Sequence, residues 1–280
     1  MGIVQIVGKK LLLTESEWNP KVIAGRALTS VVPASLLHPM MKRYYAFLLA
    51  RAPSDWVESD AAVIERLVTP DDEVVDVGAS VGAYTKFLSG KAKRVYSFEP
   101  NPEIYDFLAY NVRKLQLSNV ETFPCALSDS ERTDNMVIPR YRWGSECHYD
   151  ATLDQRQQKA GIRSIGVQVK TMDSIFCGKK ISFIKCDVNG HELRFLLGAL
   201  QTIRMCRPAI LMELLQNPEK PASDAQRVFA LLEEEGYTVH LFDGKRLRQR
   251  RPGERSQNYF FLPTPVLEGS AHGRTPGPSF

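Results

Sequence analysis

A buried strand that runs directly into a glycine-containing turn is the feature that most limits how this chain can fold. The apolar run 74–77 contains Asp76 and is followed by the turn Gly78-Ala79-Ser80-Val81-Gly82. Such a run predicts a buried strand, and glycines after it permit a sharp turn and close approach of a ligand. A second apolar run, 95–98, ends in Glu99, 23 residues after Asp76. An acidic residue at the end of the second strand of a βαβ unit can accept hydrogen bonds from both ribose hydroxyls, so the pair predicts a nucleoside-containing cofactor.

The spacing of the glycines indicates which nucleoside is bound. A dinucleotide-binding loop needs the pattern G-x-G-x-x-G, but counted from Gly78 its second and third glycine places hold Ser80 and Ala83. S-adenosylmethionine has a ribose and no phosphate, and a D-x-G-x-x-x-G loop from Asp76 to Gly82 suits it. We therefore expect S-adenosylmethionine as the cofactor. The alternatives are an NAD(P)-dependent oxidoreductase and an ordinary strand-turn-helix without a ligand.

Strand and helix patterns alternate from residue 73 onward, which predicts an α/β fold with a doubly wound, mostly parallel seven-stranded sheet. The run 259–262 follows the preceding strand too closely for a helical crossover, so we expect it to return as a final antiparallel strand. Strands are expected at 73–79, 94–99, 120–125, 181–187, 208–214 and 238–242, and helices at 82–89, 102–116, 191–204 and 223–236. Extra strands are expected at 136–138 and 167–169, with a loop from Tyr141 to Arg163 between them.

The chain divides into three parts. Residues 1–60 form a helical extension, 61–263 the main domain and 264–280 a Gly-, Pro- and Ser-rich tail that we expect to be disordered. In the extension, 40–51 predicts a helix with a basic flank, and a helix over 53–68 has Ser54 as its N-cap. We expect residues 21–51 to pack on the domain; contact with a membrane surface or a second copy is the alternative.

Composition excludes several classes of protein. The five cysteines at 125, 147, 177, 186 and 206 contain no CxxC pair, so neither a zinc site nor a disulfide framework is expected and a reducing cytoplasm fits. The apolar patch 11–13 is too short for a signal peptide, and no run reaches the length of a membrane span. A net charge of +4 does not by itself predict nucleic-acid binding.

Seven segments between about 73 and 263 together resemble the FkbM family of S-adenosylmethionine-dependent methyltransferases. They are Val75–Gly82, Ser97–Pro102, Ala126–Asp129, Val169–Ile175, Phe183–Glu192, Pro208–Glu213 and Asn258–Pro263. The stretch Lys185 to Glu192 is the most particular to this family, which usually has Glu at the position of Asn189. The resemblance implies the Rossmann-like class I methyltransferase fold and acceptors that are often sugars or natural products.

In a doubly wound sheet the ligand lies beyond the carboxyl ends of the parallel strands. Asp76 is expected to face the positive end of the cofactor, and Glu99 to hold the ribose hydroxyls. Ser128 and Asp129 are expected at the adenine edge, although Asp129 equally suits a turn or a helix cap. The complete set of predicted cofactor-binding residues is Asp76, Gly78, Ser80, Gly82, Glu99, Asn101, Ser128 and Asp129.

His191 and Asp187 are the predicted catalytic residues. His191 opens the helix after the fourth strand, and histidine is suited to accept a proton from a hydroxyl near neutral pH. Asp187 can orient His191 or accept the proton itself. The alternative is that His191 and Glu192 only favour the start of the helix. Asp187, Asn189 and Glu213 also permit a cation site, but no metal is assigned.

The basic segment Lys245–Arg251 follows the strand at 238–242. If that strand is parallel to the others, the segment emerges at the same edge as the site and suits an anionic acceptor. A solvated hairpin tip is the alternative, and nucleic acid is not expected because no aromatic residues alternate with these charges.

These features together favour an O-methyltransferase that acts on a hydroxyl of a small molecule, sugar or glycan. A non-catalytic cofactor-binding scaffold remains open because Asn189 replaces the family's carboxylate.

Overall fold

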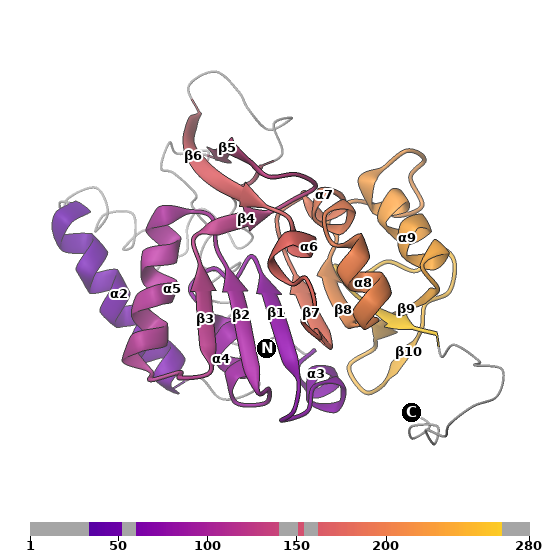
Figure 1. The fold of residues 1–280 in the computed structure, drawn as a ribbon, viewed down its shortest axis with the longest axis horizontal. Coiled ribbons are helices and arrows are strands. Elements are labelled where there is room, and N and C mark those ends of the chain that lie inside the picture. The colour runs from indigo at the N-terminus through magenta and orange to yellow at the C-terminus, as the bar shows by residue number, and fades with distance from the viewer. Residues whose placement is uncertain (1–33, 52–59, 140–150, 154–161, 265–280) are drawn as a thin grey trace, which may run out of the picture.

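The computed structural model describes residues 34–51, 60–139, 151–153 and 162–264. An eight-stranded sheet forms the centre, in the order β10-β9-β11-β8-β7-β1-β2-β3 (Figure 1). Its strands are β1 Glu73–Val77, β2 Arg94–Phe98, β3 Val120–Phe123, β7 Phe183–Cys186, β8 Ala209–Glu213, β9 Tyr237–Phe242, β10 Leu247–Gln249 and β11 Asn258–Pro263.

The sheet confirms the predicted fold class and its final antiparallel strand. Strands β3, β2, β1, β7 and β8 are parallel neighbours, whereas β11 runs antiparallel between β8 and β9. The predicted seven strands become eight because part of the basic segment forms β10, which pairs antiparallel with the end of β9. The parallel order brings the carboxyl ends of β1, β2, β7 and β8 to one edge of the sheet.

A second, three-stranded sheet accounts for the long segment after β3. It contains β4 Cys125–Leu127, β6 Arg163–Lys170 and β5 Arg132–Ile138, in that order. The predicted strand 120–125 is therefore wrong at its end: β3 stops at Phe123, and β4 leaves the main sheet to pair with β6. Pro124 lies at this break and has no N–H to offer to a continuing ladder.

The helices follow the predicted order, with one break. They are α2 Ala34–Arg51, α3 Ala61–Leu67, α4 Ala83–Ser89, α5 Pro102–Lys114, α6 Met172–Ile175, α7 Glu192–Leu197, α8 Leu200–Cys206 and α9 Asp224–Glu234. The predicted helix 191–204 is two helices, interrupted at Gly198. A Cβ there would lie 1.8 Å from the carbonyl oxygen of Ser128, so only glycine permits this close approach.

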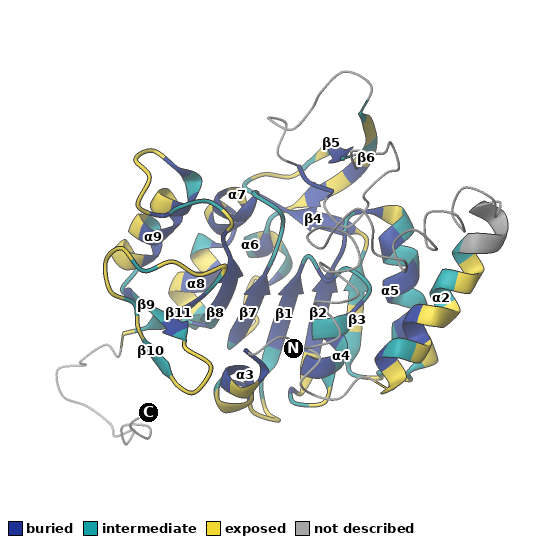
Figure 2. Cartoon of the chain, turned by 180° about the vertical axis from the view of Figure 1, so that it is seen from behind, coloured by how far each residue is buried: buried dark blue, intermediate teal, exposed yellow. Residues whose placement is uncertain are grey.

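Alternating side chains bury both faces of the main sheet. On one face Val75 and Ile184 belong to a core with helices α6 to α9, and on the other Val74 and Phe183 pack with α3 and α4. Figure 2 shows the strands as buried between these two layers. This arrangement explains why the strand sequences are almost wholly apolar, and it makes any charged residue within them conspicuous.

Helix α2 packs against α5, as we expected for this part of the N-terminal extension. The His38 and Phe107 rings stack with centroids 4.7 Å apart, and the Lys42 ammonium lies 2.5 Å from Asp106. The outer side of α2 exposes Tyr44 and Phe47. None of the helices in the described part of the chain is long and apolar enough to cross a bilayer.

Several predictions fall outside the described residues. These are the structure of 1–33, the Ser54 cap and the first half of the helix at 53–68, Cys147, most of the loop from Tyr141 to Arg163, and the tail beyond Thr264.

Candidate active site

The glycine turn after β1 is shaped by close packing as well as by its backbone. Gly78 and Gly82 have φ angles of 76° and 95°, in the left-handed region that favours glycine. A Cβ on Gly78 would lie 1.9 Å from the carbonyl oxygen of Asp187, and one on Gly82 would lie 2.9 Å from Cδ1 of Leu108. The Gly78 N–H donates to the carbonyl of Phe98 at 3.0 Å, so the turn is fastened to the end of β2.

Glu99 lies just past β2 and holds the same turn. Its Oε2 accepts from the N–H of Ser80 at 3.0 Å, and its Oε1 accepts from the N–H of Asn101 at 2.9 Å. Burial raises the pKa of Glu99 to about 7, although the hydrogen bonds from Asn101 and Ser80 and the ammonium of Lys185 act against this rise. Each carboxylate oxygen has a further lone pair, so the predicted contact with ribose hydroxyls is compatible with both bonds.

A line of polar side chains crosses three neighbouring strands on one face of the sheet. The parallel registers set Asp76 opposite Ser97 on β2 and Lys185 on β7. Asp76 is fully buried; its Oδ2 accepts from the hydroxyl of Thr85 at 2.7 Å, and that hydroxyl lies 2.9 Å from the hydroxyl of Ser97. Burial raises the pKa of Asp76, and the ammonium of Lys185 and the Thr85 bond oppose the rise.

The other oxygen of Asp76, Oδ1, has no hydrogen-bond partner among the described residues. Buried carboxylate oxygens are rarely left without one, so this atom fits a ligand that brings its own N–H donors. The amino group of a bound cofactor is such a donor. The orphaned oxygen and the glycine turn beside it are therefore compatible with the cofactor expected from the sequence.

Lys185 is the functional candidate that the sequence reasoning missed. Its Nζ lies 3.8 Å from Oδ1 of Asp76 and 3.6 Å from Oδ2 of Asp187, and it donates to the carbonyl of Gly78 at 3.3 Å. The side chain is 7% exposed, and the Nζ lies 4.9 Å from the ring centroid of Tyr84. The available signal was a charged residue inside the apolar strand Phe183–Cys186, directly across from Asp76.

Asp187 follows β7 and reaches the surface. Its N–H donates to the carbonyl of Val77 at 3.1 Å, and its side chain is 34% exposed. The turn after it is tight: Asn189 and Gly190 have φ angles of 52° and 94°. The carbonyl of Asn189 accepts from the hydroxyl of Thr152 at 2.8 Å, so this turn lies against the segment 151–153.

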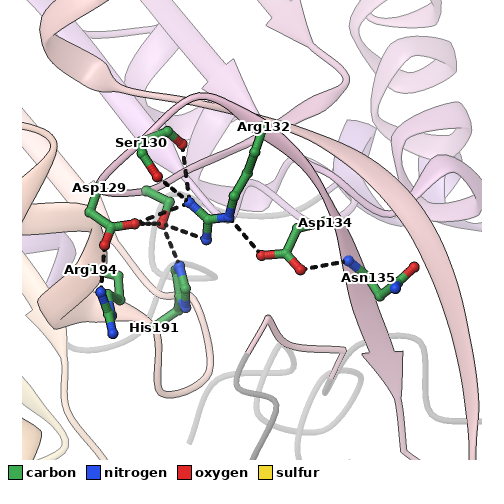
Figure 3. A network of polar contacts seen from close by, with 8 residues as sticks. Asp129, Ser130, Arg132, Asp134, Asn135, His191 and Arg194 are labelled. Atoms are coloured by element: carbon green, nitrogen blue, oxygen red, sulfur yellow. Dashed lines mark hydrogen bonds and ion pairs between the residues drawn. The ribbon is translucent and has the colours of Figure 1, made fainter.

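His191 immediately precedes α7, as predicted, and belongs to a separate polar network with Ser128 and Asp129 (Figure 3). Its Nε2 lies 2.9 Å from the hydroxyl of Ser128, and that hydroxyl donates to Oδ1 of Asp129 at 2.9 Å. The Ser128 proton is thus committed to Asp129, so Nε2 carries a hydrogen and donates to Ser128. Burial and the charge of Arg132 lower the pKa of His191 to about 4. The role of His191 as the general base stays a prediction.

Asp129 pairs with two arginines. Arg194 lies 2.5 Å from its Oδ2 and Arg132 lies 3.1 Å from its Oδ1 (Figure 3). Burial acts to raise the pKa of Asp129, but the hydrogen bonds from Arg194, Ser128 and Arg132 outweigh it and lower the pKa to about 2. Its predicted contact with adenine stays a prediction.

Six of the ten predicted site residues thus fall into two groups. The first surrounds Lys185 and contains Asp76, Gly78 and Asp187. The second is the network of Ser128, Asp129 and His191. The predicted cofactor residue Asn101 uses its side-chain oxygen to accept from the N–H of Glu103 at 3.1 Å, which caps α5. Its role toward a cofactor stays a prediction.

Strand β9 is parallel to β8, because both pair antiparallel with β11, but the basic segment after β9 lies against helix α3, where Lys245 and Leu247 line a small pocket with Arg66 and Leu67. Four strand spacings separate β9 from β1, which is roughly 19 Å. Two arginines of the basic segment form ion pairs with carboxylates elsewhere in the chain: Arg248 lies 2.7 Å from Glu254, and Arg250 contacts Glu219. Contact of this segment with an anionic acceptor stays a prediction.

No group of three or more His, Cys, Asp or Glu side chains that could hold a metal ion is found within the described ranges.

Comparison with known proteins identifies methyltransferases among the relatives of this chain. The chain matches the family model described as the methyltransferase FkbM domain over residues 76–239, which is more than half of its length. A hexuronic acid methyltransferase, AglP, from Haloferax volcanii is 31% identical over 147 residues, covering 48% of this chain and 53% of that protein. A probable cobalt-precorrin-6B C(15)-methyltransferase (decarboxylating) from Methanobrevibacter smithii is 37% identical over 90 residues, covering 31% of this chain and 48% of that protein.

The chain spans about half the length of these curated relatives. Among solved structures, an FkbM methyltransferase from Methylobacillus flagellatus is similar with a TM-score of 0.46 and 16% identity, covering 86% of this chain and 58% of that one.

Proposed function

This chain belongs to the FkbM family of S-adenosylmethionine-dependent methyltransferases, and from that premise we propose that it methylates a hydroxyl group of a sugar. The observation that carries the choice of acceptor is the similarity to a hexuronic acid methyltransferase over 147 residues. The match to the cobalt-precorrin methyltransferase is shorter, at 90 residues, and makes carbon methylation of a corrin precursor the second candidate. Family membership favours methyl transfer over the hydride transfer of an NAD(P)-dependent enzyme.

The residues that would hold the cofactor line the ends of β1 and β2. We assign Asp76 Oδ1 to the cofactor's amino group and the Glu99 carboxylate to its ribose hydroxyls. The backbone of the turn from Gly78 to Gly82 would lie against the cofactor. When bound, S-adenosylmethionine supplies a methyl group already activated by the sulfonium, so the chain's own residues mainly bind and orient.

A hydroxyl acceptor also needs a base, because an aliphatic hydroxyl is a poor nucleophile until its proton is removed. We assign this role to Asp187, whose side chain is 34% exposed. The carboxylates that end the neighbouring parallel strands are buried: Asp76 is 0% exposed, and Glu99 and Glu213 are each 7% exposed. Asp187 is thus the carboxylate of this group most open to an approaching acceptor.

His191 suits the base role less well. His191 is only 8% exposed and its Nε2 is bonded to Ser128, so its ring is less open to an approaching hydroxyl than the carboxylate of Asp187. We therefore give His191 the task of anchoring the start of α7 to the end of β4. The competing assignment of the base to His191 remains testable.

Cofactor affinity is expected to fall at acidic pH. The ionised Glu99 can accept hydrogen bonds from both ribose hydroxyls. In the protonated form one of its oxygens carries a hydrogen, so it has fewer acceptor positions for the ribose. With a pKa of about 7 in the free protein, binding at pH 5.5 should be about 30-fold weaker than at pH 8.5. Calorimetry with S-adenosylhomocysteine at several pH values measures this. The Glu99→Gln protein should bind more weakly and lose the dependence between pH 6 and 8. An equally steep profile in that variant would remove Glu99 from the ribose contact.

The proposed function is tested by supplying acceptors. The protein is incubated with S-adenosylmethionine and, separately, with glycosides of hexuronic acids, neutral hexosides and a corrin precursor, and S-adenosylhomocysteine is quantified. We expect its formation to depend on a sugar acceptor. Formation only with the corrin precursor would favour carbon methylation. Tight cofactor binding without turnover on any acceptor would favour the non-catalytic scaffold that Asn189 keeps open.

A further inference from the structure

Lys185 is a buried cation surrounded by acidic groups from four different elements. Asp76 on β1 and Asp187 after β7 lie within 3.8 Å of its Nζ. Glu213 on β8 and Glu99 after β2 also interact with it electrostatically, and the ring of Tyr84 on α4 lies 4.9 Å away. Its own neighbour Cys186 also interacts with it electrostatically.

Burying an ammonium group is costly unless carboxylates compensate it. Burial acts to lower the pKa of Lys185, but Asp187, Asp76 and Glu213 outweigh this and raise it. Lys185 is therefore protonated at neutral pH and cannot serve as a base. The positive charge of Lys185 compensates the four carboxylates with which it interacts, those of Asp76, Glu99, Asp187 and Glu213.

The position of Lys185 in the sheet directs this charge to Asp76 and to the glycine turn. Its Cα is paired with that of Asp76 in the β1–β7 register, and its Nζ also donates to the carbonyl of Gly78. One ammonium thus interacts with the buried carboxylate of Asp76 and with the first residue of the glycine turn. The same ammonium lies 3.6 Å from Oδ2 of Asp187, whose carbonyl packs closely against Gly78.

We propose that Lys185 is a positioning residue that keeps Asp76 ionised, and in place beside the glycine turn, for the amino group of the cofactor. This inference rests on the proposed use of Asp76 in cofactor binding. Without the cation, Asp76 is left buried and interacting with the like charges of Asp187 and Glu99, which favour its protonation. A protonated Asp76 attracts an ammonium group far less strongly.

The test measures the affinity for S-adenosylhomocysteine by calorimetry between pH 6 and 8.5 in the full-length protein carrying Glu99→Gln, because Lys185 also influences the titration of Glu99 and that titration must not contribute to the profile. Lys185→Met keeps the length of the side chain and removes its charge. We expect the pH at which affinity is half lost to rise by about 1 unit or more, because an opposite charge within about 4–6 Å shifts a carboxyl pKa by 1–3 units. At pH 6 the variant should bind up to about tenfold more weakly for each unit of this shift, and the deficit should shrink toward pH 8.5.

Two further variants keep the test decisive. Lys185→Arg retains the cation and should restore the midpoint measured with Lys185, even if its larger side chain lowers the melting temperature. Lys86→Met removes a half-buried lysine whose ammonium donates to the carbonyl of Leu49, and it should leave the profile unchanged. If Lys185→Met does not fold, the milder Lys185→Gln is measured in the same way.

A deficit that is the same at every pH, or no deficit, would overturn the inference and leave Lys185 a structural residue. If the wild-type protein itself fails to bind S-adenosylhomocysteine, the proposed function fails instead. The two failures are therefore distinguishable.

Discussion

Replacing Asp187 with asparagine is expected to lower the turnover number for methyl transfer by about 10²–10⁴-fold, the range typical of losing a general base. Asparagine has nearly the same shape but cannot take up the proton of the acceptor hydroxyl. Affinity for the cofactor should change much less, because the proposed contacts to its amino group and ribose come from Asp76 and Glu99. Single-turnover rates with a methyl-accepting sugar, alongside calorimetry of S-adenosylhomocysteine binding, separate the two effects.

His191→Ala is the matched variant for this prediction. We expect it to lower the melting temperature, because it breaks the bond to Ser128 that anchors α7. If His191 were the base, its loss would instead abolish turnover, and the wild-type rate would fall only near pH 4, where its imidazole becomes protonated. Loss of activity in His191→Ala with full activity in Asp187→Asn would transfer the role to the histidine.

Full activity in both variants would indicate a different acceptor atom. A hexuronic acid offers a carboxylate as well as hydroxyls, and a carboxylate is already ionised at neutral pH. Methyl transfer to it forms an ester and needs no base. The two variants together therefore report on the chemistry of the acceptor as well as on the identity of the base.

Gly78→Ala is expected to have the largest effect on both stability and cofactor binding. The new Cβ would lie 1.9 Å from the Asp187 carbonyl oxygen, at a backbone φ of 76°. The backbone conformation alone costs about 1–2 kcal/mol, and the clash forces β1 and the turn after β7 apart. We expect a loss of at least about 3 kcal/mol in the free energy of unfolding, which lowers the melting temperature by roughly 6–12 °C. Cofactor affinity should fall by about 100-fold or more, since the turn and Asp187 both move.

Two other glycines provide the controls for this prediction. Gly178 has a φ of 75° but open space around its missing side chain, so Gly178→Ala measures the cost of the backbone conformation alone. Gly166 in β6 also has open space and no left-handed φ, so its replacement should change stability by less than about 0.5 kcal/mol. Thermal unfolding of all three variants separates the clash from the conformation. A Gly78→Ala protein no less stable than Gly178→Ala would contradict the close packing of the turn.

The sequence predicted the sheet well because its strands are buried on both faces and read as continuous apolar runs. Asp76 near the end of β1 and Glu99 after β2 could be placed because glycines and a change of polarity mark where those strands end. The break between α7 and α8 was missed because Gly198 is tolerated inside a helical pattern. Its reason is the carbonyl of Ser128, which is 70 residues away in the sequence.

The site was predicted less completely, because its groups are joined by tertiary contacts. Lys185 reads in the sequence as one polar interruption of a strand, and only the register of β1 with β7 sets it opposite Asp76. The same holds for His191: a histidine at a helix start looks catalytic, but its partner Ser128 comes from the end of β4 and its pKa reflects burial and Arg132. Neither the contact of Lys185 with Asp76 nor that of His191 with Ser128 can be predicted from the adjacent sequence.

The position of the transferred methyl group tests the proposed function most directly. The protein is incubated with S-adenosylmethionine carrying a ¹³C-labelled methyl group and with a hexuronic acid glycoside, and the product is examined by NMR before and after mild alkali. We predict a labelled methyl ether on a ring hydroxyl that survives the alkali. A label released by alkali as methanol would reveal an ester, and a label bound to carbon or absent from the sugar would contradict methylation of a sugar hydroxyl.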